Sequence, residues 1–157
     1  MGPNFIGNAS NPWAFKAYFP ARDLFWVGFV AAIVASLGMI YATSRRQLSS
    51  RVIIETMLLS SMIIPFLLPK MHERFFFAAD ILSFSAAWAW RDRTSVAIAV
   101  LVQTSSALAI LSYLRRDGFF VQIGALLMAA AIAMAIARFL RCARRPEIQS
   151  RAQEALA

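Results

Sequence analysis

Residues 24–41 read LFWVGFVAAIVASLGMIY, an apolar stretch of 18 residues without a single charged side chain. A helix of that length rises about 27 Å, close to the ~30 Å hydrocarbon core of a bilayer. Gly28, Ala32, Ser36 and Gly38 supply small side chains of the kind that allow close helix packing inside membranes. The stretch therefore predicts a transmembrane helix.

Four further apolar blocks follow, at residues 52–68, 75–90, 94–114 and 119–140. Pro65 and Pro69 should kink or end the first of these. The block at 75–90 is short, so it either spans the membrane or re-enters it. The sequence thus predicts an all-α, polytopic integral membrane protein with about five transmembrane helices.

The composition excludes several classes of protein. Of 157 residues, 60% are hydrophobic and 15% are charged, whereas soluble domains have about 45–50% and ~25%. This excludes an ordinary soluble enzyme, a disordered chain and a coiled coil. The sixteen Lys and Arg residues lie between apolar blocks or in the tail, which favours contact with anionic lipid headgroups over nucleic acid. One Cys and one His make no metal-ligand cluster.

Three segments are predicted along the chain. Residues 1–22 combine Pro and Gly with aromatic residues, which is typical of an interfacial segment, with a short helix from Pro12 to Phe19. Residues 23–140 form the transmembrane bundle. Residues 141–157 form a basic polar tail, with a short surface helix after Pro146.

Five spans place the two termini on opposite sides of the membrane, and the basic residues predict which side is which. With the N-terminus outside, ten basic residues are cytoplasmic: Arg45, Arg46, Arg51, Arg91, Arg93, Arg138, Arg141, Arg144, Arg145 and Arg151. Six are outside: Lys16, Arg22, Lys70, Arg74, Arg115 and Arg116. This asymmetry favours an N-terminus outside and a C-terminus in the cytoplasm.

Ionisable residues within or beside apolar blocks are candidate functional groups, because they are costly there. They are Glu55, the polar run Lys70, His72, Glu73 and Arg74, then Asp80 and Arg138. His72 and Asp80 are eight residues apart, so on one helix they share a face. The cluster can bind a lipid phosphate through Arg74, His72 and Lys70. The alternative is an internal ion-pair network, for instance between Arg74 and Asp80.

The remaining charged and aromatic candidates have simpler interpretations. Glu55 follows Arg51 by four residues, which predicts an interfacial ion pair on one helix face. Arg138 is expected to extend toward the cytoplasmic surface. Four tryptophans suit anchoring at span ends: Trp13, Trp26, Trp88 and Trp90.

Residues 67–87 read LLPKMHERFFFAADILSFSAA. This stretch resembles the LPKMHERYF-ADVLS signature of polytopic bacterial glycosyltransferases of the GT-C type, which are related to the GPI mannosyltransferases. Phe75 replaces the usual tyrosine. The other matching residues follow in order: Pro69, Lys70, Met71, His72, Glu73, Arg74, Phe76, Asp80 and Leu82. Residues 2–5, GPNF, are similar to the APN-plus-aromatic segment that precedes the C-terminal helices of those enzymes.

The resemblance implies the C-terminal part of such an enzyme without its catalytic region. Members use a polyprenyl-phosphate sugar donor and carry an essential acidic residue in the first extracytoplasmic loop. Asp23 is the one acid before residues 24–41 and does not match that motif. General acid–base chemistry needs such a group within hydrogen-bond reach, so catalysis by this chain alone is not expected.

The sequence favours a non-catalytic integral membrane subunit, in a bacterial inner membrane, that packs against other integral membrane subunits and lipids. Photosynthetic and respiratory complexes are candidate hosts. The alternative is a truncated or split glycosyltransferase in which Lys70, His72 and Arg74 bind the lipid phosphate. A third hypothesis is a proton path through Glu55 and Asp80. No cofactor is expected other than a bound lipid or polyprenyl phosphate.

Overall fold

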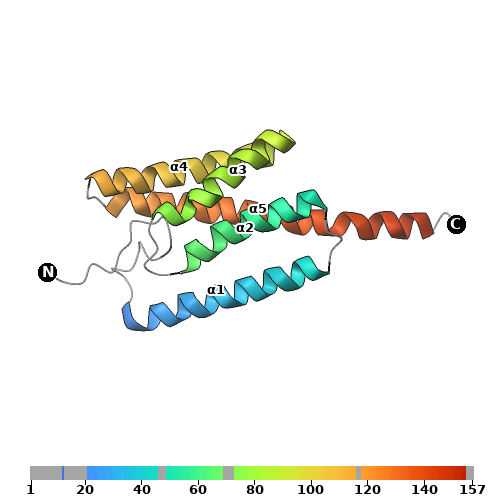
Figure 1. The fold of residues 1–157 in the computed structure, drawn as a ribbon, viewed down its shortest axis with the longest axis horizontal. Coiled ribbons are helices and arrows are strands. Elements are labelled where there is room, and N and C mark those ends of the chain that lie inside the picture. Colours follow the sequence, from blue (N-terminus) through green and yellow to red (C-terminus); the bar gives the residue numbers. More distant parts are fainter. Residues whose placement is uncertain (1–11, 13–20, 46–48, 69–72, 116–117, 155–157) are drawn as a thin grey trace.

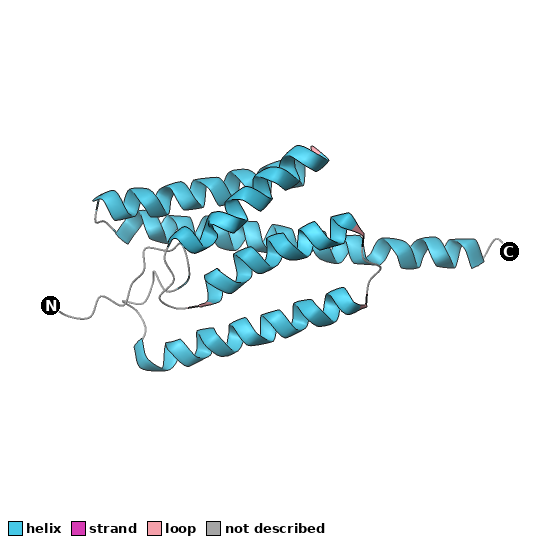
Figure 2. Cartoon of the chain, in the orientation of Figure 1, coloured by secondary structure: helices cyan, strands magenta, loops and turns pink. Residues whose placement is uncertain are grey.

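The computed structural model describes residues 12, 21–45, 49–68, 73–115 and 118–154. For residues 21–25, 73–74 and 142–154 it describes the backbone alone. The described segments are helical, with short turns and no strand among them (Figure 2). In chain order they are α1 (Ala21–Ser44), α2 (Ser50–Leu67), the 3-10 turn η2 (Glu73–Phe76), α3 (Phe77–Trp90), α4 (Arg93–Arg115) and α5 (Gly118–Glu154) (Figure 1).

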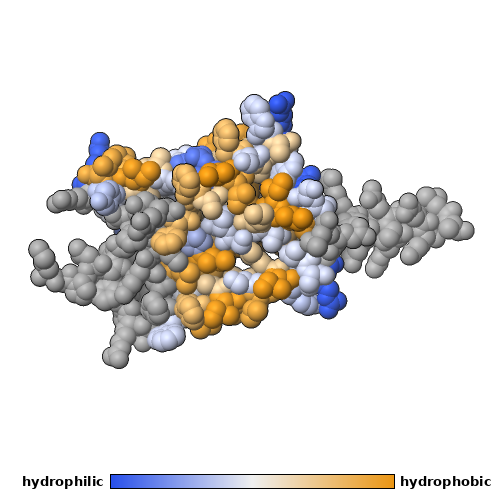
Figure 3. Space-filling view, in the orientation of Figure 1, coloured by the Kyte–Doolittle hydropathy of each residue, from blue (hydrophilic) through white to orange (hydrophobic). Residues whose placement is uncertain are grey.

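The all-α membrane fold predicted from the sequence is confirmed. Four segments are long and apolar enough to cross a membrane: Trp26–Ser44, Ser50–Leu67, Arg93–Arg115 and Gly118–Arg141. Their outward side chains are largely apolar, and on the visible face hydrophilic side chains gather toward the ends of the helices (Figure 3). A lipid environment stabilises such a surface, whereas water would not.

The short block at 75–90 forms the end of η2 and all of α3, and it packs against α2 and α4. The 14 residues of α3 rise about 21 Å. Alone, α3 is shorter than the four segments that are long enough to cross a membrane. The C-terminal end of α3 reaches the start of α2, where the Arg51 guanidinium lies 5.1 Å from the Trp90 ring centroid.

The core lies among α2, α3, α4 and α5, and α1 lies outside it along α2 (Figure 1). Small residues line the contact of α4 with α5, including Ala109 and Ala125, and the Ser105 hydroxyl donates to the Gly124 carbonyl oxygen at 2.8 Å. Small side chains let two helix backbones approach, which is how helices associate in lipid. Bulkier members fill the centre of the core: Leu58, Met62, Phe76, Ile98, Val102 and Met128.

Local sequence explains where the helices end. The Ser49 side chain accepts a hydrogen bond from the Val52 N–H and caps α2. Pro65 is tolerated in the last turn, and α2 ends at Leu67. Leu68 is extended, as expected for the residue before a proline. Arg91 adopts a left-handed conformation, with φ of 49°, and this lets the chain turn from α3 into α4 within two residues.

The ends of α1 and α3 and the starts of α2 and α4 meet at one end of the bundle, which we call the basic end. Six described arginines belong to it, namely Arg45, Arg51, Arg91, Arg93, Arg138 and Arg141, against two acids, Glu55 and Asp92. The backbone of α5 continues beyond this end through Pro146 to Glu154. The expected separate helix after Pro146 is therefore the last part of α5, since good helix formers flank the proline.

Candidate functional site

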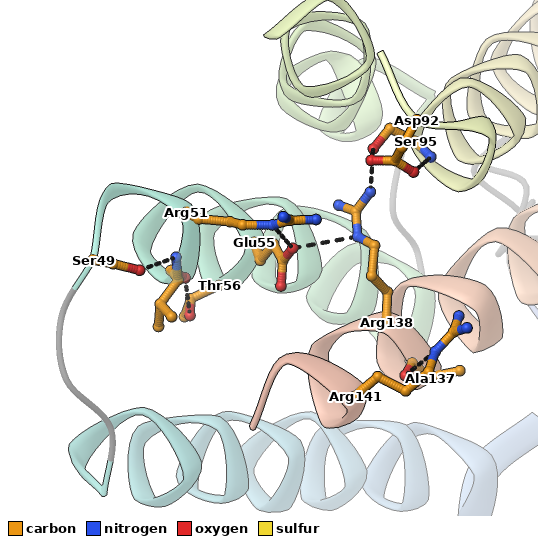
Figure 4. Close-up of polar contacts among 10 residues, drawn as sticks. Ser49, Arg51, Glu55, Thr56, Asp92, Ser95, Ala137, Arg138 and Arg141 are labelled. Carbon is orange, nitrogen blue, oxygen red and sulfur yellow. Dashed lines mark hydrogen bonds and ion pairs between the residues drawn. The ribbon is translucent and has the colours of Figure 1, made fainter. Parts of the chain in front are cut away.

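A buried ionic network lies inside the basic end (Figure 4). Glu55 of α2 is 3% exposed and Arg138 of α5 is 6% exposed. Oε1 of Glu55 is 3.4 Å from Nε of Arg138 and 3.2 Å from Nε of Arg51. A carboxylate removed from water is costly unless it is paired and hydrogen-bonded. Here the Arg51 guanidinium pairs and hydrogen-bonds with Oε1, and the Arg138 guanidinium pairs with it.

The same arginine ties the network to the start of α4. One terminal nitrogen of Arg138 donates to the Ser95 hydroxyl, and that hydroxyl donates to Oδ2 of Asp92 at 2.6 Å. Oδ1 of Asp92 accepts the Ser95 N–H at 2.8 Å and so caps α4. Two arginines and two acids thus balance in charge across α2, α4 and α5 (Figure 4).

Trp90, at the end of α3, completes the network. The guanidinium carbons of Arg138 and Arg51 lie 4.8 and 5.1 Å from its ring centroid. A cation over an indole face is attracted by about 0.5–2 kcal/mol, with the larger values at desolvated sites. Trp90 therefore holds two buried or half-buried charges in place, while Trp88 remains exposed beneath Arg91 as the predicted interface anchor.

Asp92 is outside the spans, and its pKa lies below the ordinary value of 3.8. Partial burial raises the pKa, but the Ser95 hydrogen bonds and the charges of Arg138 and Arg51 lower it by more. A carboxyl group whose pKa is depressed on folding stabilises the fold above its unfolded pKa. That contribution is lost as pH falls through the folded pKa.

Replacing Asp92 by alanine should lower the free energy of unfolding by about 1 kcal/mol at neutral pH, because α4 loses its cap. Thermal unfolding in detergent at pH 7 and near pH 3 measures the effect. The difference between wild type and Asp92→Ala should shrink at the lower pH. Asp92→Asn, which keeps a capping oxygen without the charge, should show a smaller loss and a flatter pH dependence. Equal pH slopes for wild type and Asp92→Asn would contradict the assignment.

A second polar cluster lies on the outside of the bundle, where α3 meets α4. Ser106 donates to Oδ1 of Asp80 at 2.7 Å, and the Gln103 side-chain amide donates to the Asp80 carbonyl oxygen at 2.9 Å. Gln103 is exposed, and Asp80 and Ser106 are half-buried. We call Asp80, Gln103 and Ser106 the seam cluster.

The seam cluster lies near mid-depth of the membrane. Gln103 is ten residues from Arg93 and twelve from Arg115, the two ends of α4. At 1.5 Å per residue these separations are about 15 and 18 Å. Exposed apolar side chains surround the cluster on the same outer face, among them Ile81, Phe84 and Val100. A carboxyl group and a carboxamide therefore face the hydrocarbon region.

The predicted site residues have different outcomes. Lys70 and His72 lie outside the described residues, and Glu73 and Arg74 are described as backbone in η2 only. The lipid-phosphate hypothesis for that run and its ion-pair alternative both stay predictions. Asp80 is half-buried with Ser106 as a partner.

Glu55 and Arg138 differ from the expectations for them. The predicted pair of Arg51 with Glu55 is present at 3.2 Å, but Glu55 is buried and not interfacial. Arg138 does not extend to the surface, because Glu55 and Ser95 supply its partners inside the bundle. Its distance of 83 positions from Glu55 along the chain gave no local signal for the pairing. Inside the predicted spans Arg138 is the single basic residue beside two acids, Glu55 and Asp80, and an arginine within a span needs such a partner.

Among the described residues, no three His, Cys, Asp or Glu side chains gather in a way that could hold a metal ion. Comparisons with protein-family models, curated proteins and solved structures gave no match to this chain. The ionic network and the seam cluster are therefore interpreted from their own geometry.

Proposed function

We propose that this chain is a non-catalytic integral membrane subunit whose outer α3–α4 face packs against a transmembrane helix of a larger membrane complex. The observation that carries the proposal is the seam cluster. Acyl chains offer no hydrogen-bond partner to a carboxyl group or a carboxamide. A neighbouring helix that presents a polar side chain does, and such contacts hold membrane helices together.

The rest of the polar interior supports an architectural role. The ionic network of Arg51, Glu55, Arg138 and Asp92, with Glu55 and Arg138 buried, joins three helices and is balanced in charge. A bundle that turns a mid-depth carboxyl group and carboxamide outward suits a subunit that docks sideways. The sequence resemblance also supports a non-catalytic role. The chain carries the glycosyltransferase signature at residues 67–87, but its early acid, Asp23, does not match the acidic motif of that family.

We further propose that the protein belongs to a bacterial inner membrane with its basic end in the cytoplasm. Six described arginines at that end support this orientation through the positive-inside rule. The opposite end of the described structure carries Arg115 and the backbone of η2.

The test compares assembly of two variants in the membranes of the native host. Gln103→Leu removes the exposed amide, and Val100→Leu, one turn away on the same face, is the matched control. Each interhelical hydrogen bond in a bilayer is worth about 0.6–1.7 kcal/mol, so Gln103→Leu should weaken recovery of a stoichiometric complex by about 3- to 20-fold. Val100→Leu should recover it as wild type does.

A photo-crosslinking amino acid at position 103 identifies what covers the seam cluster. One discrete protein adduct supports the proposal, and adducts with lipid alone overturn it. A transfer assay with a polyprenyl-phosphate sugar tests the alternative function. If the purified chain transfers sugar, and the double variant His72→Ala with Arg74→Ala abolishes transfer while assembly stays normal, the function is catalytic and the subunit proposal is wrong.

A further inference from the structure

A groove runs between α1 and α2, on a different face of the bundle from the seam cluster (Figure 1). It encloses about 550 Å³ and is lined by Ser36, Met39 and Thr43 of α1 and by Thr56, Ser60 and Ile64 of α2. A smaller hollow of about 270 Å³ shares Ser36 and continues along α1 to Phe29 and to Leu68. The groove volume is in the range of small-molecule sites, about 300–1,000 Å³.

The groove is long enough for a hydrocarbon chain. Its lining extends from Ser44 at the basic end to Phe29. Those sixteen residues of α1 span about 22 Å, which exceeds the ~15 Å thickness of one hydrocarbon leaflet. A chain that enters at the basic end can therefore remain in the groove to the middle of the bilayer.

Each hydroxyl group along the groove donates to a carbonyl oxygen of its own helix, and those of Thr43 and Thr56 also lie 3.4 Å apart across the groove. Ser36 donates to the Ala32 carbonyl oxygen at 2.8 Å, and Thr43 donates to that of Met39 at 2.7 Å. On α2, Thr56 and Ser60 donate to the carbonyl oxygens of Val52 and Met57. Since these donors are engaged, the walls favour a hydrocarbon occupant over a polar one.

The mouth of the groove is cationic. Arg45 follows Ser44 directly, is exposed, and lies 5.0 Å from the Tyr41 ring centroid. Arg51, in the first turn of α2, is 48% exposed but pairs with Glu55 and lies against Trp90 of α3, so Arg45 is the arginine assigned to the groove. The basic end carries more arginines than acids, so its surface attracts an anionic headgroup. Arg offers a phosphate a two-pronged contact.

We propose that the α1–α2 groove binds an anionic phospholipid of the bilayer, with one acyl chain between the helices and its phosphate at Arg45. The acyl chain fills the space that α1 leaves beside α2, and the phosphate balances the surplus charge of the basic end. The proposal does not depend on the proposed assembly role.

The test is native mass spectrometry of the full chain, purified in mild detergent, with phosphatidylglycerol or phosphatidylcholine added. Wild type should retain phosphatidylglycerol in preference. One arginine near a membrane surface contributes about a fivefold preference, so Arg45→Gln should lose that factor while still binding one lipid. Arg93→Gln, at the same end but on α4, is the charge control and should keep the preference.

Ser60→Phe tests the groove itself. The phenylalanine ring should fill the groove and abolish retention of both lipids. Gly38→Leu is the control, because a Cβ added at position 38 of α1 meets nothing within 4 Å, and it should leave lipid retention intact. Far-ultraviolet circular dichroism measures the helix content of each variant and checks that it folds. Equal retention of the two lipids by wild type, or retention unchanged by Ser60→Phe, overturns the proposal. The proposal is also overturned if the wild-type chain is a dimer that Ser60→Phe dissociates, because the occupant of the groove is then a second copy of the chain. Inorganic phosphate should not displace the lipid.

Discussion

Replacing Arg138 by leucine is expected to lower the free energy of unfolding by about 3–5 kcal/mol, because breaking a buried ion pair leaves an uncompensated charge. Glu55, 3% exposed, would keep Arg51 as its partner on the same helix and lose its partner from α5. Ser95 would lose the donor that links α4 to α5. Unfolding in mixed micelles with increasing dodecyl sulfate, followed by circular dichroism, measures the loss.

Two companion variants distinguish the buried charge from the lost packing. Arg141→Leu removes an exposed arginine one turn along, which donates to the Ala137 carbonyl oxygen of its own helix, and should have little effect. The double variant Glu55→Leu with Arg138→Leu removes both buried charges, and the half-exposed Arg51 can then be solvated. It should recover most of the lost stability. A double variant as unstable as Arg138→Leu would show that the side-chain volume of Arg138 matters more than its charge.

Replacing Ser105 by leucine should destabilise the bundle by about 3 kcal/mol. Ser105 is 0% exposed, and its hydroxyl lies 2.8 Å from the Gly124 carbonyl oxygen. A leucine there must push α4 from α5, and overpacking costs about 1–3 kcal/mol. The interhelical hydrogen bond adds about 0.6 kcal/mol on average.

Ser105→Ala isolates the hydrogen bond and should cost about 0.6 kcal/mol, the average for such a bond in a membrane protein. Ala107→Leu is the matched control, since Ala107 is exposed on the same helix and has room for the larger side chain. The same unfolding assay compares all three. If Ser105→Leu is no worse than Ala107→Leu, the close approach of α4 and α5 does not depend on a small residue at position 105.

The sequence predicted those features that depend on residues close together in the chain. The apolar block at 24–41 predicted α1, which extends three residues beyond it at each end. The pair of Arg51 with Glu55 was predicted because four residues make one helical turn. Pro69 marked the end of α2 because the residue before a proline avoids the helical conformation.

The candidate sites were predicted only in part. Asp80 was singled out as an acid inside an apolar block, but Gln103 and Ser106 were not, since uncharged polar residues carry a weak signal in a helix. Whether 75–90 spans or re-enters could not be decided from its length alone. The structure shows that Phe76 of η2 is buried in the core and that α3 ends beside the start of α2.

By itself, the sequence determined that this protein is a bundle of membrane helices with its arginines concentrated at one end, because hydrophobic length and charge asymmetry are properties of the chain in order. Only the tertiary structure decided that Arg138 pairs with Glu55 inside the bundle, that the seam cluster faces outward, and that α1 leaves a groove beside α2. Those facts depend on which helix faces lie opposite each other. That choice is made by side-chain packing between residues far apart in the chain, and no spacing along one helix encodes it.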